Sequence, residues 1–143
     1  TDPGNLGAVV RSAEVVGAEA VLMAKRRSAA ITAHAYKASA GAIAHVPIVQ
    51  ETNLVRTLER FKEAGFWVAG ASEQAEQTAW DAPLDGRIVL VMGSEGEGLS
   101  RLTRETCDFL VKLPQAGKVG SLNVAQAATA LAYEWLRRGS VGR

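Results

Sequence analysis

Residues 113 to 134, LPQAGKVGSLNVAQAATALAYE, form the most informative segment of the chain. A short apolar strand breaks at Pro114, a glycine-rich loop follows, and Ser121-Leu122-Asn123 precedes a helical pattern. The first N–H groups of a helix lack partners within the helix, and Ser or Asn side chains accept hydrogen bonds from them. Because one cap is enough, the second polar side chain is available for other work. Taken alone, the segment is explained equally well by a purely structural role, as a capped helix after a flexible loop, and by a role in ligand binding.

The rest of the chain alternates short apolar runs with helical patterns. Strands are expected at about 20–24, 66–69, 88–92 and 109–113. Helices are expected at about 6–16, 28–44 and 54–64, from about 100, and at about 123–138. The continuous apolar run Ile88 to Met92 is typical of a central parallel strand. The pattern predicts an α/β fold with a mostly parallel sheet and helices on both of its faces.

Composition narrows the class of protein. The 143 residues, 48% of them hydrophobic, suit one globular domain. Sixteen basic and fifteen acidic residues give a net charge of +1, so nucleic-acid binding would need a local basic patch, dimer geometry or another domain. The single cysteine, Cys107, is interpreted as a packed thiol, and no metal-ligand spacing is present. We therefore expect a cytoplasmic protein without a metal and without membrane contact.

The glycine-rich loop Gly93 to Gly98 follows the strand 88–92. In open α/β sheets, ligands bind beyond the carboxyl ends of the strands. The sequence GSEGEG lacks both GxxxxGK[ST] and GxGxxG, and the Glu95 carboxylate would repel a phosphate. The loop therefore favours a neutral or cationic ligand held by backbone groups, although a flexible turn with a solvated Glu95 also fits.

At the other end of the chain, Asn5 is a natural helix cap, and Arg11 lies off the apolar stripe of its helix.

Three motifs together carry a family resemblance. They are NxGxxxR at 5–11, GSEGEGL at 93–99 and LPxxGxxxSLNVAxAA from 113. In order and character they resemble the motifs of the SpoU (TrmH) family of RNA ribose 2'-O-methyltransferases, of the SPOUT class, over essentially all 143 residues. The segment 25–48 is similar to the branch that methylates a guanosine ribose in large-subunit (23S) ribosomal RNA.

The resemblance also bears on domain organisation. Members of that branch commonly carry a small RNA-binding domain before the catalytic domain. The chain opens on a turn signal, Thr1 to Asn5, without a preceding strand or methionine. We therefore expect residues 1–143 to be a SpoU-type catalytic domain that lacks the N-terminal RNA-binding domain and the first strand.

The resemblance implies a C-terminal deep trefoil knot, an exception to the rule against knotted chains. It further implies S-adenosylmethionine as cofactor, held by backbone at Gly93, Leu113 and Leu122 with Ser121 and Asn123 alongside. The family is usually homodimeric through the knot region. Small residues in the last helix would permit close packing there, although core packing alone also explains them; they are Ala125, Ala127, Ala128 and Ala132.

The implied reaction is an in-line attack of a ribose 2'-oxygen on a sulfonium methyl carbon, which needs neither a metal nor a covalent protein intermediate. Arg11 matches the family arginine that activates the 2'-hydroxyl. Because a guanidinium gives up a proton reluctantly, we interpret Arg11 as a fixed cation that stabilises the developing alkoxide. The residues expected to orient it are Asn5, Glu95, Ser121 and Asn123.

Other readings stay open. The densest basic cluster, Lys25, Arg26, Arg27 and Lys37, is a candidate RNA contact, and a solvated basic loop fits it equally well. Core packing is expected for Trp67, Trp80 and Trp135. The alternative functions are methylation of transfer RNA by the same chemistry, a binding-only module of the same fold, and an unrelated nucleotide-binding α/β enzyme.

Overall fold

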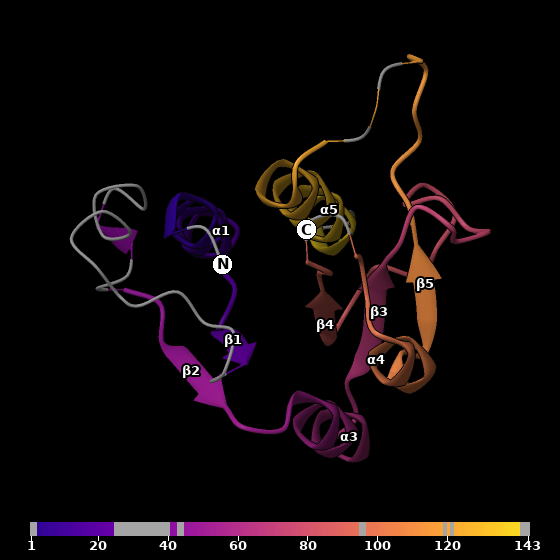
Figure 1. Ribbon diagram of the computed structural model, residues 1–143. Helices are drawn as coiled ribbons and strands as arrows, with labels where there is room; N and C mark the ends of the chain where they lie inside the picture. The colour runs from indigo at the N-terminus through magenta and orange to yellow at the C-terminus, as the bar shows by residue number, and fades with distance from the viewer. Residues whose placement is uncertain are drawn as a thin grey trace. The chain divides into compact units, whose positions relative to one another are not determined.

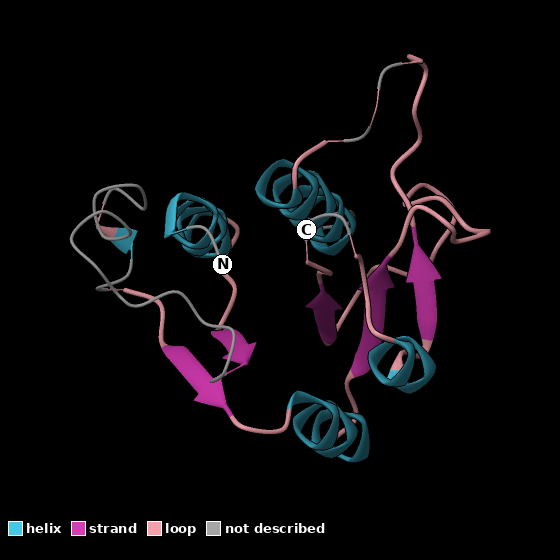
Figure 2. Cartoon of the chain, in the orientation of Figure 1, coloured by secondary structure: helices cyan, strands magenta, loops and turns pink. Residues whose placement is uncertain are grey.

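The computed structural model describes residues 3–24, 41–42, 45–94, 97–118, 120 and 122–140. The chain divides into two compact units, Thr1–Leu54 and Val55–Arg143. Figure 1 labels their helices and strands, and Figure 2 colours them by type. Most of the helix expected at 28–44 lies outside the described residues. Among the described residues, none of the helices has the length and hydrophobicity that a membrane span requires.

The first unit contains a helix and a two-stranded parallel sheet. Its elements are α1 (Pro3–Val15), β1 (Val21–Ala24) and β2 (Ile48–Glu51). Leu6 and Val10 of α1 are buried and pack in one cluster with Ala42 and Val46. Gly17, at φ +79°, ends the helix in a conformation that favours glycine. The predicted helix and first strand are confirmed.

Two details of this unit differ from the sequence expectation. Asn5 is not the helix cap, because α1 already begins at Pro3, whose fixed φ suits the first turn of a helix. The strand β2 was not predicted at all. Its sequence IVQE is short, half polar and directly preceded by a proline, so it shows little strand signal. It pairs in register with β1, from Val21 opposite Ile48 to Ala24 opposite Glu51.

The second unit is built around a three-stranded parallel sheet with the strand order β4-β3-β5. Its elements in chain order are α3 (Leu54–Glu63), β3 (Trp67–Ala71), β4 (Ile88–Val91), α4 (Arg101–Thr106), β5 (Phe109–Val111) and α5 (Val124–Ser140). Each was predicted to within a few residues. All described strand pairs of the chain are parallel, which confirms the predicted fold class.

Helices cover both faces of this sheet, as two successive residues of β3 show. Ala69 is fully buried in one cluster with Leu131 of α5. A Cβ at the next residue, Gly70, would lie 2.7 Å from the Sγ of Cys107, directly after α4. Because successive strand residues point to opposite faces, α5 covers one face and the end of α4 the other. In Figure 1 these helices lie on different sides of β3.

A buried carboxylate anchors the last helix. The Glu134 side chain is only 3% exposed, and its two oxygens pair with Arg137 at 2.6 Å and Arg138 at 3.2 Å. The hydrogen bond from Arg137 lowers the pKa of Glu134 below its ordinary value, and that from Arg138 adds to this effect. The Arg138 Nη2 also donates to the carbonyl oxygens of Ala79 at 2.7 Å and Trp80 at 2.9 Å. This network fixes α5 to the loop that follows β3.

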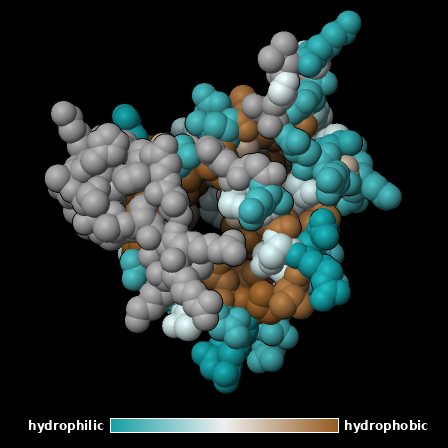
Figure 3. Space-filling view, viewed as in Figure 1, coloured by the Kyte–Doolittle hydropathy of each residue, from teal (hydrophilic) through white to brown (hydrophobic). Residues whose placement is uncertain are grey.

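The prediction of buried tryptophans is wrong for two of the three. Trp67 is 59% exposed and Trp80 is 61% exposed. Trp67 is the first residue of β3. Trp80 contacts α5 through its backbone carbonyl. The buried residues on either side of it are Ala79 and Ala82. Trp135 is half-buried, and its indole N–H donates to the Gly86 carbonyl at 2.8 Å. Figure 3 shows hydrophobic surface between hydrophilic patches on the visible face.

Candidate cofactor-binding site

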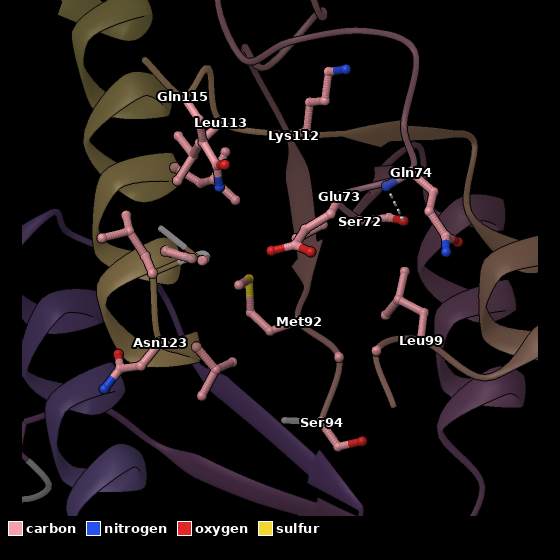
Figure 4. Close-up of a pocket in the computed structure, with 18 of the residues that line it drawn as sticks. Ser72, Glu73, Gln74, Met92, Ser94, Leu99, Lys112, Leu113, Gln115 and Asn123 are labelled. Atoms are coloured by element: carbon pink, nitrogen blue, oxygen red, sulfur yellow. Dashed lines mark hydrogen bonds between the residues drawn. The ribbon is translucent and has the colours of Figure 1, made fainter. Parts of the chain in front are cut away.

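A cavity of about 910 Å³ lies in the second unit, at the carboxyl ends of its three strands. Its volume falls within the roughly 300 to 1,000 Å³ of small-molecule sites. The lining comes from the loops after β3, β4 and β5 and from the start of α5, chiefly residues 71–74, 92–94, 97–99, 112–117 and 122–124. Figure 4 shows these segments arranged around the open space. The position agrees with the rule for ligands of open α/β sheets.

The glycine loop after β4 is closed by its own backbone. Ser94 N–H donates to the Gly98 carbonyl at 3.2 Å, and Gly98 N–H donates to the Ser94 carbonyl at 2.9 Å. A Cβ on Gly93 would overlap the backbone of Gly98 and come within 2.6 Å of the Leu99 nitrogen. Only glycine at residue 93 therefore lets the start of this loop approach its end at Gly98 and Leu99. Glu95 lies outside the described residues.

Backbone hydrogen bonds join the loops that follow β3 and β5. Ser72 N–H donates to the Val111 carbonyl at 2.9 Å. Beyond it, Lys112 N–H donates to Gln77 at 3.0 Å and its carbonyl accepts from Ala79 N–H at 2.8 Å. This pairing continues the sheet past the regular strands. The cavity wall is therefore held by main-chain bonds rather than by side chains alone.

Asn123 is the cap of α5. Its Oδ1 accepts a hydrogen bond from Gln126 N–H at 2.9 Å, and its own N–H donates to Gln126 Oε1 at 3.4 Å. This reciprocal pair is a capping box with asparagine and glutamine as its members. The side-chain oxygen of Asn123 thus serves the helix start, while the residue also lines the cavity. Ser121, the other candidate cap, lies outside the described residues.

The structure brings together four of the residues that the sequence singled out: Gly93, Leu113, Leu122 and Asn123 all line the cavity. Asn5 and Arg11 belong to α1 of the first unit, where Asn5 is half-buried and Arg11 is exposed. The basic residues expected to contact RNA lie outside the described residues; they are Lys25, Arg26, Arg27 and Lys37.

Sequence reasoning missed one wall of the cavity. Residues 72–74, including the charged Glu73, follow β3 and line the space together with its last residue, Ala71, and with Lys112 after β5. The predicted strand ended at Ala69, two residues before β3 does, and no motif marked the turn that follows. The available signal was its position after the carboxyl end of a parallel strand.

Cys107 is not poised for nucleophilic chemistry. Its thiol is half-buried and donates to the Thr103 carbonyl at 3.2 Å. Burial, reinforced by the neighbouring Asp108 carboxylate, raises the pKa of Cys107 from 9.0 to about 11. The thiol is therefore neutral near pH 7, which fits the predicted packing role.

Comparisons with known proteins agree on one family. The model of the SpoU rRNA Methylase family matches residues 1–133. The 23S rRNA (guanosine-2'-O-)-methyltransferase RlmB of Pseudomonas putida is 48% identical over 143 residues, which cover all of this chain and 58% of that protein. The putative TrmH family tRNA/rRNA methyltransferase YacO of Bacillus subtilis is 48% identical over 142 residues, covering 99% of this chain and 57% of that one.

Solved structures share the fold. The SpoU methyltransferase AviRb from Streptomyces viridochromogenes, in complex with the cofactor AdoMet, superposes with a TM-score of 0.87 at 31% identity. The match covers 96% of this chain and 56% of AviRb. The chain thus spans somewhat more than half the length of these relatives.

Proposed function

The chain belongs to the SpoU rRNA Methylase family, and we propose that it methylates a ribose 2'-hydroxyl of RNA with S-adenosylmethionine as the methyl donor. The observation that carries the proposal is geometric. Gly93 follows β4, and Leu113 and Leu122 lie near the two ends of the connection between β5 and α5; the family motifs put all three at the cofactor, and all three line one cavity. Coincidence of three motif residues at one site is not expected of a module without a ligand there.

The cavity suits the cofactor. Its volume of about 910 Å³ accommodates an adenosine joined to an amino acid. Gly93 brings backbone groups close to the space, and the backbone at Leu113 and Leu122 would complete the cradle. AviRb, a structural relative, was solved with AdoMet. When bound, S-adenosylmethionine supplies a methyl carbon activated by a sulfonium.

The residues of the chain would supply positioning and a fixed charge. Arg11 would hold the phosphate beside the target ribose and stabilise negative charge on the 2'-oxygen, leaving water or phosphate to accept the hydroxyl proton. Positioning of two reactants alone can contribute about 7 to 11 kcal/mol to the barrier reduction. The residues proposed to orient Arg11, the ribose and the loops are Asn5, Glu95, Ser121 and Asn123.

We propose a guanosine of 23S ribosomal RNA as the target. The support is the 48% identity to a relative named 23S rRNA (guanosine-2'-O-)-methyltransferase. The relative named as a tRNA/rRNA methyltransferase is equally similar, so transfer RNA is the second candidate. The basic cluster Lys25, Arg26, Arg27 and Lys37 would contact RNA phosphates.

The proposal extends to the assembly. By family resemblance, the C-terminal segment forms a trefoil knot and two copies associate through that region. The small residues of α5 are compatible with close helix packing, and Ala125 and Ala128 are already buried within the chain. The cytoplasmic location suggested by the single cysteine stays a prediction.

Titration calorimetry with S-adenosylmethionine tests the cofactor assignment, and absence of binding would contradict it.

The role of Arg11 is tested by Arg11→Lys, which keeps the charge but loses the planar fork. We expect this variant to bind the cofactor like the wild type and to lose most of its turnover on RNA. Arg60→Lys, at another exposed helical position, is the matched control and should turn over normally. Near-normal turnover by Arg11→Lys would remove Arg11 from the mechanism.

A further inference from the structure

Glu73 occupies a fixed place at the cavity. It lies in the turn that follows β3, where Ala75 N–H donates to the Ser72 carbonyl at 3.1 Å and Gln74 N–H donates to the Ser72 hydroxyl at 3.2 Å. Ser72 is itself bonded to Val111 of β5, and Ala75 is only 5% exposed. The backbone of Glu73 is therefore held on both sides.

The Glu73 carboxylate points into the cavity (Figure 4). No described residue forms an ion pair with it or donates a hydrogen bond to it. A carboxylate accepts hydrogen bonds through two oxygens and donates none. Its natural ligand at this position is therefore a cation or a pair of hydroxyl donors.

We infer that Glu73 accepts hydrogen bonds from the ribose hydroxyls of the adenosyl group and so determines specificity for a ribonucleoside cofactor. The inference rests on the proposed function, because it assumes that S-adenosylmethionine occupies this cavity. Vicinal hydroxyls present two donors that match the two oxygens of a carboxylate. Acidic residues read ribose hydroxyls in the same way in other open α/β sheets.

The alternative ligand for the carboxylate is the sulfonium, and catalysis argues against it. Methyl transfer removes the positive charge of the sulfur. A carboxylate placed against that charge would stabilise the ground state more than the transition state and so slow the reaction. The ribose hydroxyls do not change during transfer, so hydrogen bonds to them hold the cofactor without raising the barrier.

Binding calorimetry with the cofactor and with S-adenosylhomocysteine tests the inference. Glu73→Gln should weaken both ligands equally, by about tenfold, as expected for losing a charge-assisted hydrogen bond. Removing the 2'- or 3'-hydroxyl from S-adenosylhomocysteine should weaken binding to the wild type and have little further effect in Glu73→Gln. Such coupling is the signature of a direct contact.

Glu76→Gln is the matched control, because Glu76 is an exposed residue of the same loop that does not line the cavity. It removes the same charge and should bind both ligands like the wild type. If Glu73→Gln loses affinity only for S-adenosylmethionine, the carboxylate reads the sulfonium and the inference is wrong. Unchanged affinity in Glu73→Gln would also overturn it. If the wild type binds neither ligand, the proposed function itself fails.

Discussion

Gly93 shows how one residue can decide the shape of the cavity. Its missing side chain lets the ends of the loop 93–98 come together, and the two hydrogen bonds between Ser94 and Gly98 close the loop. What Gly93 provides is space rather than an unusual backbone angle. Among the described residues of this loop, the positive φ belongs to Gly98, at +70°.

We predict that Gly93→Ala destabilises the protein by about 1 to 3 kcal/mol, the cost of overpacking a site with no room. The substitution should also weaken cofactor binding, because the loop must open to make room for the methyl side chain of the introduced alanine. Gly117→Ala is the control for stability, since a Cβ there meets no atom within 4 Å. Urea unfolding measures both variants. Equal stability of Gly93→Ala and the wild type would show that the loop does not need its close contact.

A second prediction concerns Cys107. With its pKa raised from 9.0 to about 11, the thiol carries about a hundredfold less thiolate at pH 8 than an unperturbed cysteine. Iodoacetamide should therefore alkylate the native protein far more slowly than the urea-unfolded chain, as followed by mass spectrometry. Rapid alkylation of the native protein would mean that the thiol is neither buried nor bonded to Thr103.

At the scale of elements, α5 depends on the network around Glu134. Its carboxylate is nearly fully buried, and Arg138 connects it to the carbonyls of the loop after β3. Because Leu131 of the same helix lines the cavity, this network also holds one wall of the site. The carboxylate does not take part in the proposed chemistry and serves the placement of the helix.

We predict that Glu134→Gln lowers the free energy of unfolding by about 1.5 to 3 kcal/mol at neutral pH, the range for hydrogen bonds to charged groups. Glu105→Gln is the matched control. Its ion pair with Arg101 is exposed, with side chains 60% and 75% accessible, so the loss should stay within about 0.5 kcal/mol.

The same variant predicts a pH dependence. The folded state lowers the pKa of Glu134, so its contribution is complete above the unfolded pKa and is lost as the pH falls through the folded pKa. The stability gap between wild type and Glu134→Gln should therefore narrow on acidification, as measured by urea unfolding at a series of pH values. A gap that is constant or widens would contradict the assigned pairing.

Most elements could be predicted from the sequence because their signals are local. Apolar runs marked β1, β3, β4 and β5, and Asn123 marked the start of α5. The end of β3 was missed because Gly70 and Ala71 have little intrinsic preference for strands. They are strand residues because they pair with Leu110 and Val111 of β5, which is a long-range contact that the local sequence does not show.

Across the whole molecule, the hydrophobic periodicity of the sequence did not show that the loops after β3, β4 and β5 meet at one cavity. The family resemblance predicted that Gly93, Leu113 and Leu122 act together. In the structure all three line one cavity. The turn at Glu73 belongs to the same wall, yet no motif marked it. It is found only when the parallel strands are aligned and their carboxyl ends compared.

As a whole, the molecule is proposed to transfer a methyl group to a ribose of RNA. The most direct test incubates the purified protein with unmethylated 23S ribosomal RNA and S-adenosylmethionine, followed by mass spectrometry of the released nucleosides. We predict one new 2'-O-methylguanosine, formed much more slowly when Arg11 is replaced by lysine. An RNA without any new ribose methylation, recovered from a protein that binds the cofactor, would contradict the claim.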